Sequence, residues 1–178
     1  NIADDGGGMN NASSTIDMNN ALISGNIAAD GSGGGILDIT SKSNIINTTI
    51  SGNQGAFGAG GISSFGGEIN LTNSIIAKNN QTPVLVNVAH LGAISSGSDF
   101  SGNTEDYVQV LSAFLPKGNY TWQALNVPVL VEPSKDGITR EVGITGNINV
   151  TMAPGLEMRF ASDVGIVLLD NGSLKALG

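Results

Sequence analysis

The sequence predicts an all-β protein, a right-handed parallel β-helix (β-solenoid) with coils of about 27 residues. Three observations lead to this fold class: an internal repeat without gaps, apolar positions that recur at the same place in each repeat, and invariant asparagines beside glycine-rich turns. The composition agrees, because only 12% of the residues are charged and 4% are aromatic, and Asn, Ser, Thr and Gly supply the polar groups. These residue types favour short strands and turns over helices.

The repeat defines the period. The three segments that align without a gap are residues 8–26, 35–53 and 61–79. Their closing asparagines, Asn26, Asn53 and Asn79, are 27 and then 26 residues apart. Several short strands within a period of this length indicate a solenoid, in which one coil cannot bury its apolar side chains alone and stacking buries a continuous core.

Apolar positions form columns through the three segments. These columns are Met9, Ile36 and Ile62; Met18, Ile45 and Leu71; and Ile23, Ile50 and Ile76. Alternation around the second column, as in Ile16-x-Met18, has the period of a β-strand. We therefore expect these side chains to point inward on successive coils.

Two asparagine columns accompany the apolar ones. They are Asn20, Asn47 and Asn73, and Asn26, Asn53 and Asn79. Identical side chains stacked at strand spacing can hydrogen-bond along the axis, so both columns are predicted to be asparagine ladders. The glycine runs, such as Gly33–Gly35, allow positive φ and close backbone approach at the turns.

The segments GGGI (33–36), NTTISGN (47–53), AGGI (59–62) and LTNSIIAKN (71–79) resemble known repeats. They are similar to the β-helix repeats of bacterial surface proteins, namely autotransporter passengers and polymorphic outer-membrane proteins. The resemblance covers residues 1–103 and implies a right-handed parallel β-helix in a secreted or cell-surface bacterial protein.

The chain divides into three predicted regions. Residues 1–103 form regular coils, residues 104–121 form a loop or excursion, and residues 122–178 form further, less regular coils. The turn dipeptides Pro154-Gly155 and Asn171-Gly172 punctuate the last region. A separate β-sandwich over residues 120–178 is the alternative.

Charge and composition exclude several partner classes. The net charge is −8 with only seven Lys and Arg residues, so no basic patch suits nucleic acid. No apolar run is long enough for a membrane span.

Asp4, Asp5 and Asp30 are the candidate ligands for a metal, calcium, because Asp5 and Asp30 follow Asn1 and Asn26 at the same offset. The third coil has Phe57 at that place, so the alternative is solvated turn acids; no other cofactor is expected.

No constellation of catalytic residues is recognised. His90 is the only histidine and has no acid, serine or cysteine at a motif spacing. Asp17 is expected to point outward and stack on Asn44 and Asn70 rather than on a second acid. Lys42 and Glu68 fall in one column and are predicted to form a surface ion pair.

The sequence thus favours a structural or adhesive β-solenoid module of a secreted or cell-surface protein, which binds or spaces rather than catalyses. Carbohydrate or other surface proteins are the expected partners. End-to-end self-association is expected too, because both ends of the sequence lie within coil patterns. The alternative is a fragment of a carbohydrate-active enzyme, a polysaccharide lyase or glycoside hydrolase, on the same scaffold.

Overall fold

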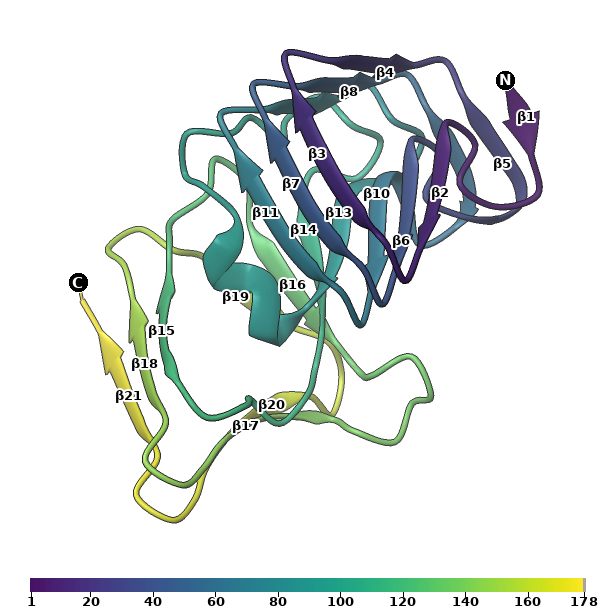
Figure 1. Ribbon diagram of the computed structural model, residues 1–178. Helices are drawn as coiled ribbons and strands as arrows, with labels where there is room; N and C mark the ends of the chain where they lie inside the picture. The colour runs from purple at the N-terminus through teal and green to yellow at the C-terminus, as the bar shows by residue number, and fades with distance from the viewer. Residues whose placement is uncertain (178) are drawn as a thin grey trace.

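The computed structural model, which describes residues 1–177, is a parallel β-solenoid of about seven coils (Figure 1). Its largest sheet contains seven parallel strands, one from each coil. In chain order these are β2 (Met9–Ala12), β6 (Ile36–Ile39), β10 (Ala59–Phe65), β13 (Thr82–Asn87), β14 (Val108–Leu111), β16 (Val129–Glu132) and β19 (Met158–Phe160). The pairing of each strand with its counterpart in the next coil makes residues of equal position stack along the axis.

A second side of the solenoid consists of two three-stranded sheets. The first contains β3 (Thr15–Asn19), β7 (Lys42–Ile46) and β11 (Glu68–Thr72), and the second contains β15 (Asn119–Trp122), β18 (Asn149–Met152) and β21 (Ser173–Ala176). The 3₁₀-helix η1 (Val88–Ala93) packs against both β11 and β15 and lies where a strand of the intervening coil would be (Figure 1).

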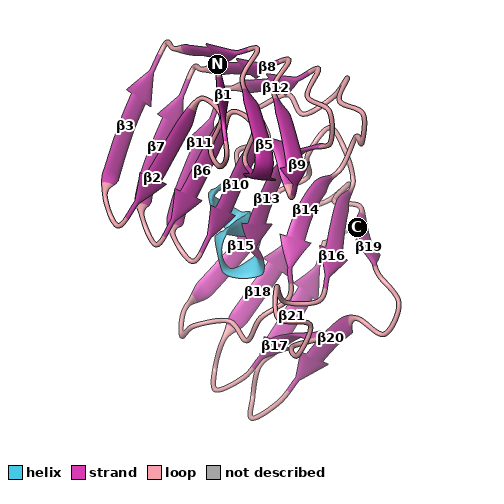
Figure 2. Cartoon of the chain, turned by 90° about the vertical axis from the view of Figure 1, so that its right-hand side faces the viewer, coloured by secondary structure: helices cyan, strands magenta, loops and turns pink. Residues whose placement is uncertain are grey.

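Further strands complete the coils (Figure 2). The regular coils add β4 (Leu22–Ser24), β8 (Thr49–Ser51) and β12 (Ile75–Ala77), and also β1 (Ile2–Ala3), β5 (Ile27–Ser32) and β9 (Gln54–Phe57). The last two coils instead add β17 (Glu141–Ile144) and β20 (Gly165–Leu168), which pair with each other.

The register confirms the predicted columns. Met9, Ile36 and Ile62 are direct partners in β2, β6 and β10, and the other two columns pair in the same way. Ile36, Ile45 and Ile50 are fully buried. The three aligned segments therefore occupy successive coils in register, as the repeat predicts.

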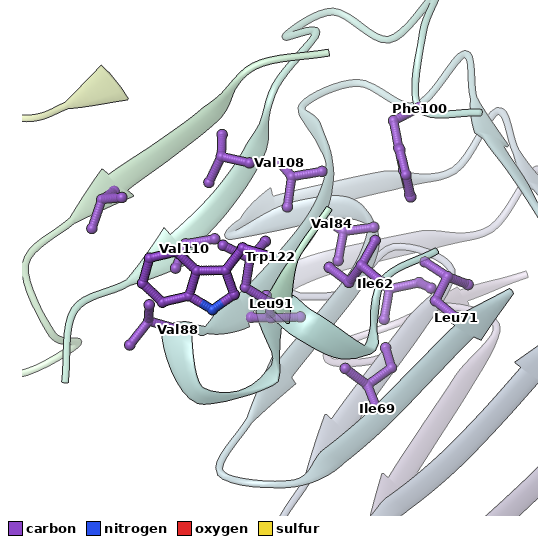
Figure 3. Close-up of a cluster of buried hydrophobic side chains, with 14 of the residues drawn as sticks. Ile62, Ile69, Leu71, Val84, Val88, Leu91, Phe100, Val108, Val110 and Trp122 are labelled. Carbon is purple, nitrogen blue, oxygen red and sulfur yellow. The ribbon is translucent and has the colours of Figure 1, made fainter. Parts of the chain in front are cut away.

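Larger side chains fill the core near η1. Trp122 is fully buried and lies beside Val88, Leu91 and Val110 (Figure 3). Phe100 is also fully buried and belongs to the same cluster. The wider side chains fill the space where the regular isoleucine columns end, as close packing of an interior requires.

The prediction that residues 104–121 form a loop or excursion is wrong for two segments. Residues 108–111 form β14, which pairs in parallel with β13 and β16 in the centre of the largest sheet, and residues 119–121 belong to β15, which pairs with β18. Only Val108 and Val110 of β14 are fully buried. This inward–outward alternation is too short to identify a strand in a sequence that also contains Phe114 and Pro116.

Residues 122–177 continue the solenoid. β16 pairs in parallel with β14, and β19 pairs in parallel with β16. The alternative of a separate β-sandwich is therefore wrong, because the strands of this region extend the existing sheet. Each of the last two coils contains three strands, β16 to β18 and then β19 to β21. Pro154 and Gly155 lie in the turn before β19.

We predict that Ile50→Asp unfolds the solenoid, because it buries a charge with no partner among apolar side chains. Ile50→Ala should lower the free energy of unfolding by about 2–5 kcal/mol. Leu22→Asp, at an outward position of the same face, is the control and should change stability by less than about 1 kcal/mol. Urea denaturation followed by circular dichroism measures all three variants, and equal losses for Ile50→Asp and Leu22→Asp would contradict the inward assignment.

Candidate functional site

The outward side of β3, β7 and β11 carries a continuous set of polar side chains, which we call the polar face. Its columns are Thr15, Lys42 and Glu68, and Asp17, Asn44 and Asn70. The intervening residues point inward; Ile45 and Leu71, for example, are fully buried. Strand alternation thus separates a polar surface from an apolar core within the same three strands.

The amides of the polar face are joined from coil to coil. Asn70 Nδ2 donates to Asn44 Oδ1 at 2.9 Å, and Asn44 Nδ2 is 3.5 Å from Asp17 Oδ1. Thr72 Oγ1 donates to Asn70 Oδ1 at 3.2 Å. This confirms the predicted stacking of Asp17 on Asn44 and Asn70. An amide has two N–H groups and an oxygen with two lone pairs, so both asparagines keep hydrogen-bonding capacity toward solvent.

Lys42 and Glu68 form the predicted ion pair, with Nζ 3.2 Å from Oε2. Their side chains are 72% and 70% exposed, so the pair contributes less than about 1 kcal/mol to stability. Its effect on the polar face is electrostatic, because the ammonium of Lys42 is neutralised by its neighbour on the next coil.

A shallow, open hollow of about 340 Å³ lies on the polar face. It is lined by Thr15, Asp17, Lys42, Ser43, Asn44 and Asn70. A second hollow of about 180 Å³ lies by Phe65, where Lys135 Nζ sits 3.9 Å from the centre of the ring. The first hollow is the larger of these two, and all of its lining residues are polar.

A fully buried carboxylate lies beneath this region. Asp38 Oδ1 accepts from Asn11 Nδ2 at 2.9 Å and from Ser43 Oγ at 3.0 Å, and Asp38 Oδ2 accepts from Ser64 Oγ at 3.2 Å. Asn11, Asp38 and Ser64 are register partners in β2, β6 and β10. These hydrogen bonds offset the cost of burying the carboxylate and join three coils inside the core.

His90 lies on η1, where the Asn87 side chain accepts a hydrogen bond from Ala89 N at the start of the helix. Burial lowers the pKa of His90 below its ordinary value of 6.5, while the charges of Glu68 and Asp38 act in the opposite direction. Folding therefore favours the neutral imidazole over the charged imidazolium.

The predicted calcium ligands lie at the first corner of the solenoid. Asp4, Asp5 and Asp30 are exposed, and Asp5 Oδ1 accepts from Ser32 N at 3.2 Å. Asp30 N donates to the backbone oxygen of Asp4 at 3.3 Å. Within residues 1–177, no group of three or more acidic, histidine or cysteine side chains is placed to hold a metal ion. The calcium site stays a prediction.

Asn26, Asn53 and Asn79 form a hydrogen-bonded ladder. Asn26 Nδ2 donates to Asn53 Oδ1 at 3.0 Å, and Asn53 Nδ2 donates to Asn79 Oδ1 at 3.2 Å. The ladder also includes Asn103, whose Oδ1 accepts from Asn79 Nδ2 at 2.9 Å. Each step also uses the backbone, as in Asn53 Nδ2 to the oxygen of Ile23 at 3.1 Å.

The prediction of a side-chain ladder is wrong for the other asparagine column, which works through its backbone. Asn20, Asn47 and Asn73 have φ of 54°, 50° and 48°, a left-handed conformation that asparagine tolerates better than most residues. Asn47 Nδ2 donates to Asn19 Oδ1 at 3.4 Å rather than to a member of its own column. The recurrence of asparagine here follows from the turn.

A hydroxyl ladder follows this turn and is absent from the sequence-based expectations. Ala21 N donates to Thr48 Oγ1 at 3.4 Å, Thr48 N to Ser74 Oγ at 3.1 Å, and Ser74 N to Ser98 Oγ at 3.1 Å. The hydroxyls come from two residue types, and the column begins with Ala21, so no invariant residue marks it in the sequence.

Comparisons with protein-family models, with curated proteins and with solved structures find no match to this chain. Among the described residues, no helix is long and apolar enough to cross a membrane.

The two asparagine columns should respond differently to substitution. Asn53→Ala removes partners of the buried Asn79 and of partly buried groups of Asn26 and Ile23, and it should cost about 2–4 kcal/mol of unfolding free energy. Asn47→Ala should cost about 1–2 kcal/mol through its positive φ, whereas Asn47→Gly should be close to neutral. Urea midpoints measure all three, and a loss for Asn47→Gly as large as that for Asn53→Ala would refute the distinction.

Stability should depend on the titration of His90. Because the folded-state pKa is below 6.5, the unfolded chain binds the proton more readily. The contribution of His90 to the free energy of unfolding is therefore fully present above pH 6.5. It is lost as the pH falls from 6.5 through the lowered folded-state pKa. His90→Gln should flatten this part of the profile, measured as urea midpoints between pH 7.5 and 5.5. An unchanged slope in the variant would assign the dependence to other groups.

Proposed function

We propose that this chain is a structural and adhesive β-solenoid module of a secreted or cell-surface bacterial protein, which binds or spaces rather than catalyses. The observation that carries the proposal is the polar face, an exposed array of amide, hydroxyl and ion-paired groups on three coils in register. A stack of coils joined by backbone hydrogen bonds holds such an array at fixed spacing over its whole length.

The chemistry of this array suits recognition. Asp17, the acid on the edge of the hollow, is stacked on an amide in the next coil, and Glu68 is paired with Lys42. Glycoside hydrolysis uses two carboxyl groups that face the same bond, one as an acid and one as a base or nucleophile. Asp17 and Glu68 each have a partner in the array instead, which favours binding over hydrolysis.

The partners that we propose are carbohydrates or other surface proteins, with copies of this chain in end-to-end contact as a further partner. Light scattering over a concentration series tests the self-association, which should raise the average mass with concentration. A mass that stays at that of one chain over the series would refute it.

We predict that the chain releases no products from soluble polysaccharides. Incubation with a panel of neutral and acidic polysaccharides should leave reducing ends and the absorbance of unsaturated sugars at the level of the blank. In parallel, beads coated with the chain should adhere to polysaccharide-coated or protein-coated surfaces more than albumin-coated beads do.

The competing function, a polysaccharide lyase or hydrolase, makes the opposite prediction. Product release that disappears in Asp17→Asn, or in Asp99→Asn in the segment that follows η1, would establish catalysis and refute the proposal. Both side chains are exposed, but Asp99 also accepts hydrogen bonds from Ser101 and Asn126, so circular dichroism checks that each variant is folded.

A further inference from the structure

We infer that the polar face is a binding site for a neutral, hydroxyl-rich glycan chain that lies along the solenoid axis across β3, β7 and β11. This inference rests on the proposed binding function and names its ligand class and its residues. It starts from the hollow of about 340 Å³, whose outward side chains are two amides, a hydroxyl, a carboxylate and an ammonium.

The hydrogen-bonding groups of the polar face match sugar hydroxyls. Asn44 and Asn70 each use one N–H along the ladder, which leaves the second N–H and a lone pair of the oxygen for a ligand. A hydroxyl group both donates and accepts, so adjacent hydroxyls of a sugar ring can engage an amide from both of its sides. Thr15 adds a further exposed hydroxyl at the edge of the hollow.

The charges select against anionic ligands. Lys42 is paired with Glu68 at 3.2 Å, and Asp17 leaves the polar face with one excess negative charge. The whole chain carries −8, so its field repels sulfated or uronic-acid polymers and nucleic acids. A neutral glycan meets no such repulsion.

The repeat of the face favours a polymer over a small sugar. Equivalent groups recur once per coil, at the strand spacing of about 4.8 Å. A similar ladder continues on the other side of η1, where Asn149 Nδ2 donates to Asn119 Oδ1 at 2.9 Å in β18 and β15. Figure 1 shows η1 between these two sheets, so the polar groups follow the axis beyond the first hollow.

The test uses the whole chain and named probes: a soluble neutral β-glucan, a neutral mannan, a neutral xylan, and heparin as the sulfated polymer. Affinity gel electrophoresis and titration calorimetry measure binding. We expect at least one neutral polymer to bind, and Asn44→Ala and Asn70→Ala each to raise its Kd by about fivefold or more. Heparin should bind more weakly than that polymer.

Two matched variants separate this site from other surfaces. Asn10→Ala removes an exposed asparagine from β2, outside the polar face, and should leave the Kd within about twofold. Asp30→Asn removes an exposed charge from β5, also outside the polar face, and should likewise leave the Kd within about twofold. Circular dichroism checks that each variant is folded.

Several results would overturn the inference: no binding of any neutral polymer, a Kd unaffected by Asn44→Ala and Asn70→Ala, an effect of Asn10→Ala or Asp30→Asn as large as theirs, or tighter binding of heparin. The bead assay distinguishes this failure from failure of the proposed function. Adhesion that persists with unchanged strength in Asn44→Ala and Asn70→Ala refutes the glycan site alone, whereas absence of adhesion to every surface refutes the adhesive function as well.

Discussion

Backbone hydrogen bonding between successive coils in parallel register is the interaction on which the rest of this structure depends. Each strand of the largest sheet pairs with its equivalent in the next coil, from β2 to β19. A residue therefore has as its neighbours the residues one period before and after it. A polar group inside the coil therefore finds its partners in that column, in its own coil or in the neighbouring backbone, and a group that finds none is left buried and unsatisfied.

The inward polar residues show how this constraint is met. Asn53 can be fully buried because Asn26 and Asn79 lie on either side of it in the column, where Asn26 donates a hydrogen bond to it and Asn79 accepts one from it. Asp38 is fully buried for the same reason, because Asn11 and Ser64 in the adjacent coils donate hydrogen bonds to its carboxylate. Buried polar ladders of this kind penalise any slip in register, since a shift of one residue would separate donor from acceptor.

The same constraint shapes the outward surface. The register that stacks inward side chains into a core also stacks outward side chains into ordered columns. The polar face therefore follows from the same register that buries Ile45 and Leu71. The 3₁₀-helix η1 interrupts this order for one coil. Its Val88 and Leu91 face the core beside Trp122, and the strand columns resume at β15.

The sequence by itself determined the fold class, the coil period, the three apolar columns and the stacking of Asp17 on Asn44 and Asn70, because a repeat without gaps transmits register from one coil to the next. Only the tertiary structure decided which elements replace the repeat where it becomes irregular. It showed that residues 108–111 form a central strand, that η1 replaces a strand, and that Asp38 is enclosed by three coils. It also separated the two asparagine columns, since Asn53 acts through its side chain and Asn47 through a positive φ. A sequence column records that a residue recurs, but the backbone angle and the enclosing coils determine the physical reason for it.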